Sequence, residues 1–359
     1  MVDPLRVAVL PGDGIGPEVV REGLRVLHEV AALDDLKVEV ESFPQGAEHY
    51  LATGELATPA FLDEVAGFDA LYLGAVGDPR VAPRVLEAEL LIAISRHFQM
   101  DISVRPYRLA NASLTPLKGR EPGDIDLVVV RECAEDLFAL PAGAIHPGTD
   151  DEVQVGGIAF SRRMVERVTR YAFELARTRR HRLVMVEHSN AAASHDMWRH
   201  TFERLAPEYD DVESWRMAPD GFAMTLIADP GIFDVVVTSW MLGGIFSDMA
   251  AAFVGGLGLS GSARLSSSGG PSMFEPIHGS APKYAGADLA SPLAAIHSVE
   301  LLLRHHGQVR SADRIANGIE RVLVSGQVPS ATARSGVPTH RQGDLILDAI
   351  RDDDTASRS

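Results

Sequence analysis

The residues best suited to hold a ligand lie in a short polar segment in the last quarter of the chain. Its centre is the sequence Gly-Ser-Ala-Pro at 279–282, a tight turn of small residues where a backbone can approach a bulky ligand closely. Polar side chains flank this turn on both sides, among them Glu275, His278, Lys283 and Tyr284. A turn of this kind can hold a nucleotide.

A second glycine-rich turn lies near the start of the chain. Residues 12–16 read Gly-Asp-Gly-Ile-Gly and are followed by Pro17. Their spacing does not fit the G-x-G-x-x-G fingerprint of dinucleotide-binding turns, because the third glycine arrives one residue early. Two interpretations stay open on these residues alone: part of a cofactor site, or a strand-to-helix turn whose glycines supply positive φ angles.

The elements that must position these turns follow an alternating pattern. Residues 5–10 predict a buried strand, and residues 19–30 predict an amphipathic helix that starts near Pro17. Further short apolar strands are expected at 71–73, 127–130, 183–186 and 233–237. Helices are expected between them at 162–176 and 196–205. This alternation predicts an α/β fold.

Length and composition restrict the class of protein. A chain of 359 residues with 46% hydrophobic content can form one large or two ordinary domains. The single cysteine, Cys133, and a start that runs straight into a strand without a signal peptide lead us to expect the cytoplasm. The apolar runs are too short to cross a bilayer. A net charge of −17 argues against binding to nucleic acid or to anionic membranes.

The turn at 12–16 and the segment at 272–286 together closely resemble the β-decarboxylating dehydrogenases, which include isocitrate, 3-isopropylmalate, homoisocitrate and tartrate dehydrogenases. The resemblance spans about residues 5–325. It implies a two-domain, isopropylmalate dehydrogenase-like α/β fold with a discontinuous first domain. That first domain, residues 1–102 plus 257–359, would bind the cofactor. The second, residues 103–256, would carry the interface of a homodimer.

The resemblance assigns cofactor binding to ten residues: Gly14, Ile15, Glu275, His278, Gly279, Ser280, Ala281, Lys283, Tyr284 and Ser291. NAD-using relatives place an aspartate at the position of Lys283 to accept from ribose hydroxyls, and a lysine cannot accept. Lys283 with Tyr284 resembles the NADP-using isocitrate dehydrogenases, so NADP is expected, with NAD as the alternative. The other interpretation of Lys283 is a solvated surface side chain. Ser291 replaces a common asparagine, which weakens the expected adenine contacts.

Substrate binding in the family depends on three arginines that hold carboxylates through bidentate contacts. Arg105 and Arg131 match the second and third of them, and the first position falls on Ser95. The neighbouring Arg96 would have to reach around a helix, because one residue corresponds to about 100° of rotation. The alternative for Arg105 and Arg131 is an ion pair that links the domains.

The two proton-transfer positions of the family are both changed. Its tyrosine corresponds to Phe138, which cannot transfer a proton, and its lysine corresponds to His188. Histidine can act as a general base near neutral pH, so His188 is a candidate replacement for the lysine. The alternative is a polar histidine that only lines the pocket.

The metal-binding aspartates of the family are only partly present. The family holds Mg²⁺ or Mn²⁺ with three aspartates, of which Asp220 and Asp248 are present, while Gly244 stands one helical turn before Asp248. Two carboxylates can still hold magnesium at lower affinity when waters and substrate complete the octahedron. A transition-metal site of Asp220, His188 and Asp248 is the alternative. In the family's geometry, His188 and Asp220 would enter the site from the partner subunit.

Three functions follow from this mixture of retained and lost residues. The first is an NADP- or NAD-dependent oxidoreductase acting on an altered 2-hydroxy acid related to isopropylmalate or isocitrate, with or without decarboxylation. The second is a catalytically impaired, ligand-binding or regulatory member of the family that works with a catalytic partner subunit. The third is a redox-neutral reaction such as a decarboxylation. The nearly complete cofactor segment favours the first, and the changes at 95, 138, 188 and 244 favour the second.

Overall fold

The computed structural model describes residues 3–333 and 335–358. By the contacts between residues, the chain divides into two compact units. Unit 1 comprises residues 1–100, 105–125 and 250–359, and unit 2 comprises residues 101–104 and 126–249. Strand β4 (Met100–Arg108) and helix α8 (Trp240–Val254) each contribute residues to both units.

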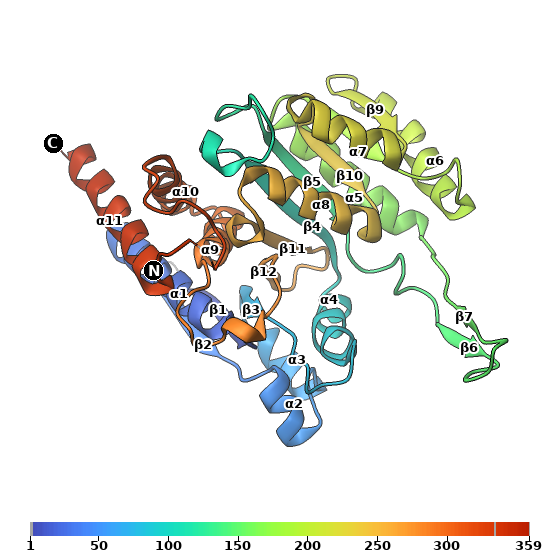
Figure 1. Ribbon diagram of the computed structural model, residues 1–359, viewed down its shortest axis with the longest axis horizontal. Coiled ribbons are helices and arrows are strands. Elements are labelled where there is room, and N and C mark those ends of the chain that lie inside the picture. The colour runs from blue at the N-terminus through green and yellow to red at the C-terminus, as the bar shows by residue number, and fades with distance from the viewer. Residues whose placement is uncertain (1–2, 334, 359) are drawn as a thin grey trace. The chain divides into compact units, whose positions relative to one another are not determined.

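Unit 1 is built on a sheet in which most neighbouring strands are parallel (Figure 1). Its strands follow the order β2 (Val38–Ser42), β1 (Leu5–Gly12), β3 (Ala70–Ala75), β12 (Ser272–Pro276) and β11 (Gly261–Ser266). The first four run parallel, and β11 runs antiparallel to β12. The predicted α/β fold is therefore confirmed in this unit.

Helices cover both faces of the unit 1 sheet. The helices of this unit are α1 (Gly16–Leu33), α2 (Ala47–Thr53), α3 (Pro59–Val65), α4 (Ala93–His97), α9 (Leu293–His305), α10 (Val309–Val324) and α11 (Thr339–Arg358). A π-helical turn, Glu87–Ile92, leads into α4. Helices α1 and α9 pack against the strands on one face, and apolar residues of α2, α3 and α4 form a core with the other.

Alternation along β3 shows how the two faces are separated. Leu71 and Leu73 belong to the core that includes α2, α3 and α4. Tyr72 points to the opposite face, where its hydroxyl donates to the carbonyl of Ala295 in α9 at 3.0 Å. The period of two in a strand therefore sends the large polar-tipped side chain toward α1 and α9 and the leucines away from them.

Unit 2 contains a second group of parallel strands. They follow the order β5 (Asp126–Glu132), β10 (Val235–Thr238), β8 (Arg182–Val186) and β9 (Glu213–Met217). All three pairings are parallel. The predicted strands at 127–130, 183–186 and 233–237 are confirmed to within a few residues.

The helices of unit 2 are α5 (Arg162–Arg177), α6 (Asp196–Leu205), α7 (Pro219–Ala228) and most of α8. Helix α5 begins where the Ser161 hydroxyl accepts from the backbone N–H of Met164 at 3.2 Å, and its buried face packs on β5, β8 and β10. A separate antiparallel hairpin joins β6 (Gly143–Ile145) to β7 (Val153–Val155).

The predicted domain ranges, 1–102 with 257–359 and 103–256, stay a prediction. Contact-based units do not show which segment binds a cofactor or forms a dimer, and they place residues 105–125 in unit 1. Within the described residues, no helix combines the length and the apolar character needed to cross a membrane.

A tight contact between α1 and β3 generates a prediction about stability. A Cβ added at Gly23 would overlap the fully buried Tyr72 hydroxyl and lie 3.0 Å from the ring carbon that carries it. We expect Gly23→Ala to destabilise the protein, because overpacking costs about 1–3 kcal/mol. The gain from alanine in a helix, about 1 kcal/mol, is smaller. Denaturant unfolding measures the change.

The matched control is Gly221→Ala in α7, where the nearest atom, Met217 Cε, lies 4.0 Å from the added carbon. This variant should gain stability from helix propensity alone. Combining Gly23→Ala with Tyr72→Phe should cost less than the sum of the two single changes, since the overlapping oxygen is gone. Strictly additive costs would contradict the contact.

Candidate functional site

The glycine turn after β1 is held by one carboxylate. Asp13 is buried, and its two oxygens accept from the backbone N–H of Ala47 at 2.6 Å and of Gly77 at 2.8 Å. The backbone N–H of Asp13 donates to the carbonyl of Ala75 at 2.7 Å. The turn is therefore fixed to the start of α2 and to the loop that follows β3.

This turn also packs directly against the Gly-Ser-Ala-Pro turn. Ile15 donates its backbone N–H to the carbonyl of Ser280 at 2.8 Å. Gly14 has a φ of +59°, and a Cβ there would overlap the Ser280 carbonyl. The glycine is needed both for its positive φ and for this close approach. Gly14, Ile15, Ser280 and Ala281, which has a φ of +38°, thus form one continuous backbone surface.

His278 presents a buried acceptor within the same segment. Its Nδ1 lies 3.0 Å from the carbonyl of Gly279, and an imidazole nitrogen at that distance from a carbonyl must donate. Burial lowers the pKa of His278, so the ring is neutral at pH 7 and its Nε2 is an acceptor. Nε2 is buried and has no hydrogen-bond partner among the described residues. Such an atom suits a ligand hydroxyl.

The residues after the turn include one exposed cation, Lys283, and polar groups that are partly or fully buried. Lys283 and Tyr284 lie on a short 3₁₀ turn, Pro282–Tyr284, with Lys283 exposed. The Lys283 ammonium lies over the Tyr284 ring, 4.8 Å from its centre. Ser291, further along, is buried, and its hydroxyl accepts from the backbone N–H of Leu293 at 3.5 Å, near the start of α9.

The segment begins on a strand, with Glu275 on β12. Its carboxylate accepts from Arg264 Nε at 2.6 Å, and both side chains are buried. Arg264 lies on the neighbouring strand β11, and its Nη1 donates to Ser95 Oγ at 3.4 Å. Arg96, by contrast, is exposed while Ser95 is buried, so the two residues face opposite ways on α4. Arg264 was not identified from the sequence, because its strand, with glycine and serine at the ends, has no strong local pattern.

In unit 2, the expected substrate arginine Arg131 lies at the end of β5 and is buried. Its guanidinium lies over the Trp240 ring, 5.6 Å from the centre, and Nη1 is 3.5 Å from the Trp240 carbonyl. A Cβ added at Gly244 would lie 3.5 Å from Nη1. Because residue 244 is a glycine, it places no side chain against the Arg131 guanidinium. Arg105, on β4 in unit 1, is also buried.

Phe138 packs against the same tryptophan. The two ring centres are 4.2 Å apart with an angle of 35° between the planes, and Phe138 is 36% exposed. Arg131, Trp240 and Phe138 therefore form one cluster of a cation and two aromatic rings.

Two buried carboxylates occupy the first backbone donors of α8. Glu132 accepts from the backbone N–H of Trp240 at 3.3 Å, and Asp136 accepts from that of Met241 at 2.8 Å. Burial raises the pKa of Glu132 to about 7. Backbone N–H groups at a helix start would otherwise attract an anionic ligand. Here the protein's own carboxyl groups accept from the N–H groups of Trp240 and Met241, so these two donors are already used within the chain.

His188 follows β8 and is positioned by a second histidine. Its backbone N–H donates to Nδ1 of His195 at 3.2 Å, and the ring centres are 6.5 Å apart. Burial lowers the pKa of His195, consistent with a neutral ring that accepts at Nδ1. The His188 ring is partly exposed and can reach a ligand.

The expected metal ligands do not form a cluster within one chain. Asp220 lies in the first turn of α7 and Asp248 on α8, and both are exposed. Across the described residues, no group of three or more His, Cys, Asp or Glu side chains could hold a metal ion. The residues of a single chain therefore do not fit a complete divalent-metal site, and we derive no chemical step through a metal.

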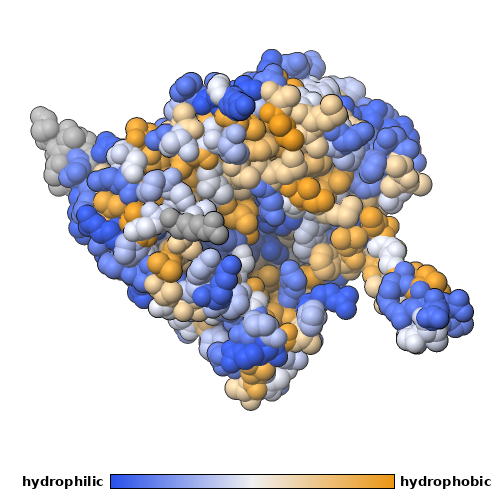
Figure 2. Space-filling view, in the orientation of Figure 1, coloured by the Kyte–Doolittle hydropathy of each residue, from blue (hydrophilic) through white to orange (hydrophobic). Residues whose placement is uncertain are grey.

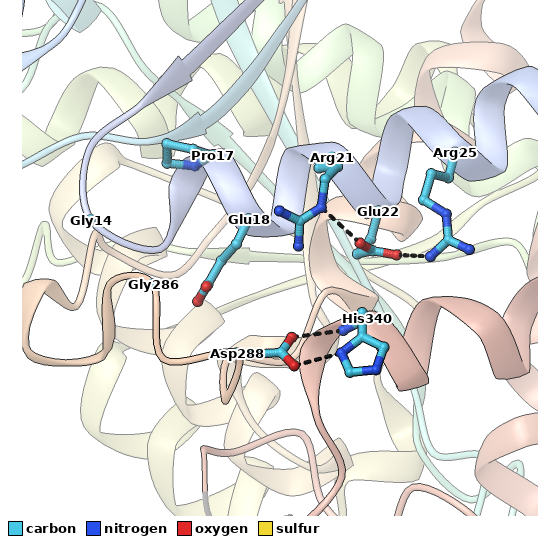
Figure 3. Close-up of a pocket in the computed structure, with 9 residues that line it drawn as sticks. All are labelled: Gly14, Pro17, Glu18, Arg21, Glu22, Arg25, Gly286, Asp288 and His340. Carbon is cyan, nitrogen blue, oxygen red and sulfur yellow. Dashed lines mark hydrogen bonds and ion pairs between the residues drawn. The ribbon is translucent and has the colours of Figure 1, made fainter.

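A pocket of about 680 Å³ lies in unit 1 beside the N-terminus of α1 (Figure 3). Its charged groups mostly pair with one another: Arg25 with Glu22, and His340 with Asp288. Figure 3 shows Glu18 directed from α1 toward the loop at Gly286. Of the predicted site residues, only Gly14 lines this pocket, so it is distinct from the catalytic candidates.

The structure thus gathers the predicted residues into local groups. Unit 1 brings together the cofactor segment, the glycine turn and Ser95, the last through Arg264 and Glu275. Unit 2 brings Arg131 together with Phe138 through Trp240 and places His188 against His195. Asp220 and Asp248 remain apart from any cluster of potential metal ligands among the described residues.

Comparisons with known proteins agree with this architecture. The family model of isocitrate/isopropylmalate dehydrogenases matches residues 6–346. A 3-isopropylmalate dehydrogenase from Frankia casuarinae is 42% identical over 341 residues, covering 94% of this chain and 97% of the relative. One from Streptomyces coelicolor is 42% identical over 346 residues, with 95% and 97% covered.

Solved structures show the same fold. An isocitrate dehydrogenase from Methylococcus capsulatus has a TM-score of 0.84 at 27% identity, covering 96% of this chain and 99% of that one. A β-decarboxylating dehydrogenase from Thermococcus kodakarensis has a TM-score of 0.78 at 28% identity, with 97% and 96% covered. The chain therefore belongs to the isocitrate/isopropylmalate dehydrogenase family.

Proposed function

We propose that this protein is an NADP-preferring dehydrogenase that oxidises a 2-hydroxy acid related to isopropylmalate or isocitrate, with a substrate different from both. The observation that carries the proposal is the cofactor segment. It folds directly onto the glycine turn and presents Lys283 and Tyr284 side by side at the surface. The fold of the family and the relatives named 3-isopropylmalate dehydrogenase support the reaction class.

The residues fit a nicotinamide dinucleotide. At Gly279 an added Cβ would meet no atom within 4 Å, so a large ligand can come close there, and Nε2 of His278 can accept from a ribose hydroxyl. Lys283 suits a 2′-phosphate because it can neutralise that charge, whereas it cannot accept from a ribose hydroxyl. When bound, the cofactor supplies the hydride acceptor. Glu275, Ser280, Ala281 and Ser291 complete the proposed binding residues.

The acid is held by residues of one copy of this chain and deprotonated by a residue that a second copy contributes. Arg105 and Arg131 are buried guanidinium groups suited to carboxylates. His188 takes the proton of the substrate hydroxyl, and the hydrogen bond to His195 fixes the backbone of this base. By resemblance, His188 and Asp220 serve the site of a partner copy. A divalent metal, if used, would need Asp220 of one chain and Asp248 of the other.

The substrate difference rests on the aromatic cluster. Phe138 cannot donate a proton, and it packs against Trp240, whose ring lies beside the Arg131 guanidinium. A bulkier or flatter acid suits this surface better than isocitrate does. The same change supports the second candidate, a ligand-binding member with impaired catalysis, and turnover measurements separate the two.

A homodimer fits the exposed apolar side chains of unit 2. Met224 and Ile227 on α7 and Ile245 on α8 are each more than half exposed. Figure 2 shows hydrophobic residues gathered over these two helices. Apolar groups of this kind on helices of a folded chain mark an interface. The hairpin of β6 and β7 also exposes Ile145, Val153 and Val155.

The cofactor assignment predicts the effect of reversing one charge. Lys283→Asp should lower NADP affinity by roughly 10–100-fold, because a charge-assisted contact to the 2′-phosphate is replaced by repulsion. NAD affinity should rise, since the carboxylate can accept from ribose hydroxyls. Calorimetric titration with both cofactors measures this, with the exposed Lys37→Asp as control. Tighter binding of NAD than of NADP by the unchanged protein would contradict the assignment.

The catalytic assignment predicts weak turnover of familiar substrates. We expect little activity on isocitrate or 3-isopropylmalate, because positioned proton transfer contributes roughly 10²–10⁴-fold in rate. Restoring both groups in Phe138→Tyr/His188→Lys should raise kcat on one of these acids at least about tenfold. The control is His200→Lys, which changes an exposed histidine on α6. Vigorous turnover of either acid by the unchanged protein would refute the altered substrate.

The proposed dimer predicts the effect of a buried charge. Ile245→Glu should dissociate the dimer, because an unpaired carboxylate would be forced into an apolar interface. Light scattering after size-exclusion chromatography reports the mass. Leu51→Glu in unit 1 changes a similarly exposed apolar residue and should leave the mass unchanged. A monomeric unchanged protein would overturn the dimer.

A further inference from the structure

Arg264 is a charged residue placed in the interior of a strand. It lies on β11, and its side chain is 8% exposed. Arginine is rarely buried, because removing its charge from water costs several kcal/mol unless partners compensate. Stability alone seldom favours such a residue, since an apolar side chain of similar volume usually does as well. Recognition of a ligand therefore explains a buried arginine at 264 better than stability does.

The neighbouring strand holds this guanidinium in one orientation. Ser262 pairs with Glu275, and Arg264 pairs with Met273, so Arg264 and Glu275 are diagonal neighbours on one face of the antiparallel pair. The Nε···Oε1 distance of 2.6 Å is that of a charge-assisted hydrogen bond. Glu275 belongs to the cofactor segment. Arg264 is thereby placed next to the residues proposed to bind the cofactor.

The third member is Ser95, which comes from helix α4. Its hydroxyl accepts from Arg264 Nη1 at 3.4 Å, and the residue is 1% exposed. A serine is short enough to leave room for a guanidinium that arrives from β11. An arginine at 95 would bring a second positive charge to the same place, with repulsion added to crowding. The short side chain at 95 therefore makes room for the long side chain at 264.

We propose that Arg264 binds a carboxylate of the substrate, with Ser95 and Glu275 as the residues that orient its guanidinium. This inference rests on the proposed function, since it names a substrate contact for that reaction. A guanidinium offers N–H donors in a planar fork whose geometry matches that of a carboxylate. The substrate must then carry a carboxylate that reaches the unit 1 strands β11 and β12, beside the cofactor residues.

The experiment is calorimetric titration of the full-length protein, in the presence of NADP and magnesium, with malate and with 3-isopropylmalate. Arg264→Ser should weaken binding of the better of these two acids by roughly 10–100-fold. Arg264→Lys keeps the charge beside Glu275 but loses the planar fork, so it should bind with intermediate affinity. Arg314→Ser is the matched control, because Arg314 on α10 is equally buried in unit 1 and pairs with Asp34, which directly follows α1.

A reciprocal exchange guards against a variant that fails to fold. The double variant Ser95→Arg/Arg264→Ser carries the guanidinium on α4 instead of on β11. It should recover at least part of the affinity lost in Arg264→Ser. If Arg264→Ser unfolds, the lysine variant and the exchange decide the question. Wild-type affinity in a folded Arg264→Ser protein, failure of the unchanged protein to bind either acid, or a folded exchange variant with no recovery would each overturn the assignment.

Parallel turnover assays separate this inference from the proposed function. Loss of acid binding in Arg264→Ser, together with no turnover of any 2-hydroxy acid by the unchanged protein, supports the carboxylate contact and contradicts the enzyme. Turnover by the unchanged protein with an unaltered KM in Arg264→Ser supports the enzyme and contradicts the contact.

Discussion

The carboxylate of Asp13 is the interaction on which the arrangement of unit 1 depends. One buried side chain satisfies the backbone N–H groups of Ala47 and Gly77, which belong to segments far apart in the sequence. A buried charge is stable here because it accepts charge-assisted hydrogen bonds and needs no cation. It fixes the turn after β1, and that turn in turn receives the Ser280 carbonyl through Ile15. The cofactor segment is therefore positioned by backbone contacts.

This constraint explains why the glycines are spaced differently from a common dinucleotide turn. In the G-x-G-x-x-G arrangement, glycines let the backbone approach a pyrophosphate. Here Gly12 approaches the backbone of Ala75 and Gly14 approaches that of Ser280. Of the two interpretations left open by the sequence, the structure shows the turn whose glycines supply positive φ angles and close chain packing. A role of the turn in cofactor binding stays a prediction.

Much of the fold was predictable from the sequence, because the signals were local. Apolar runs such as 127–130 and the helical period at 162–176 appear as β5 and α5. Strands β11 and β12 were not predicted, since an antiparallel pair with serine and glycine at its ends has no strong local pattern. Their pairing is what joins Arg264 to Glu275. Side chains that meet only through such pairing cannot be found by spacing along the chain.

The residues of the candidate site differ in whether local geometry or tertiary contacts determine their placement. The exposure of Arg96 follows from helical geometry, and the sequence already argued against it as a substitute for an arginine at position 95. The contact of Trp240 with Phe138 and Arg131 depends on the start of α8, where Glu132 and Asp136 take the backbone donors. With those donors occupied by the protein's own carboxyl groups, the Arg131 guanidinium lies over the Trp240 ring, against which Phe138 also packs. Phe138 thus adds a second ring to the apolar surface that begins beside the arginine, and this arrangement depends on tertiary contacts that the spacing of residues along the chain does not show.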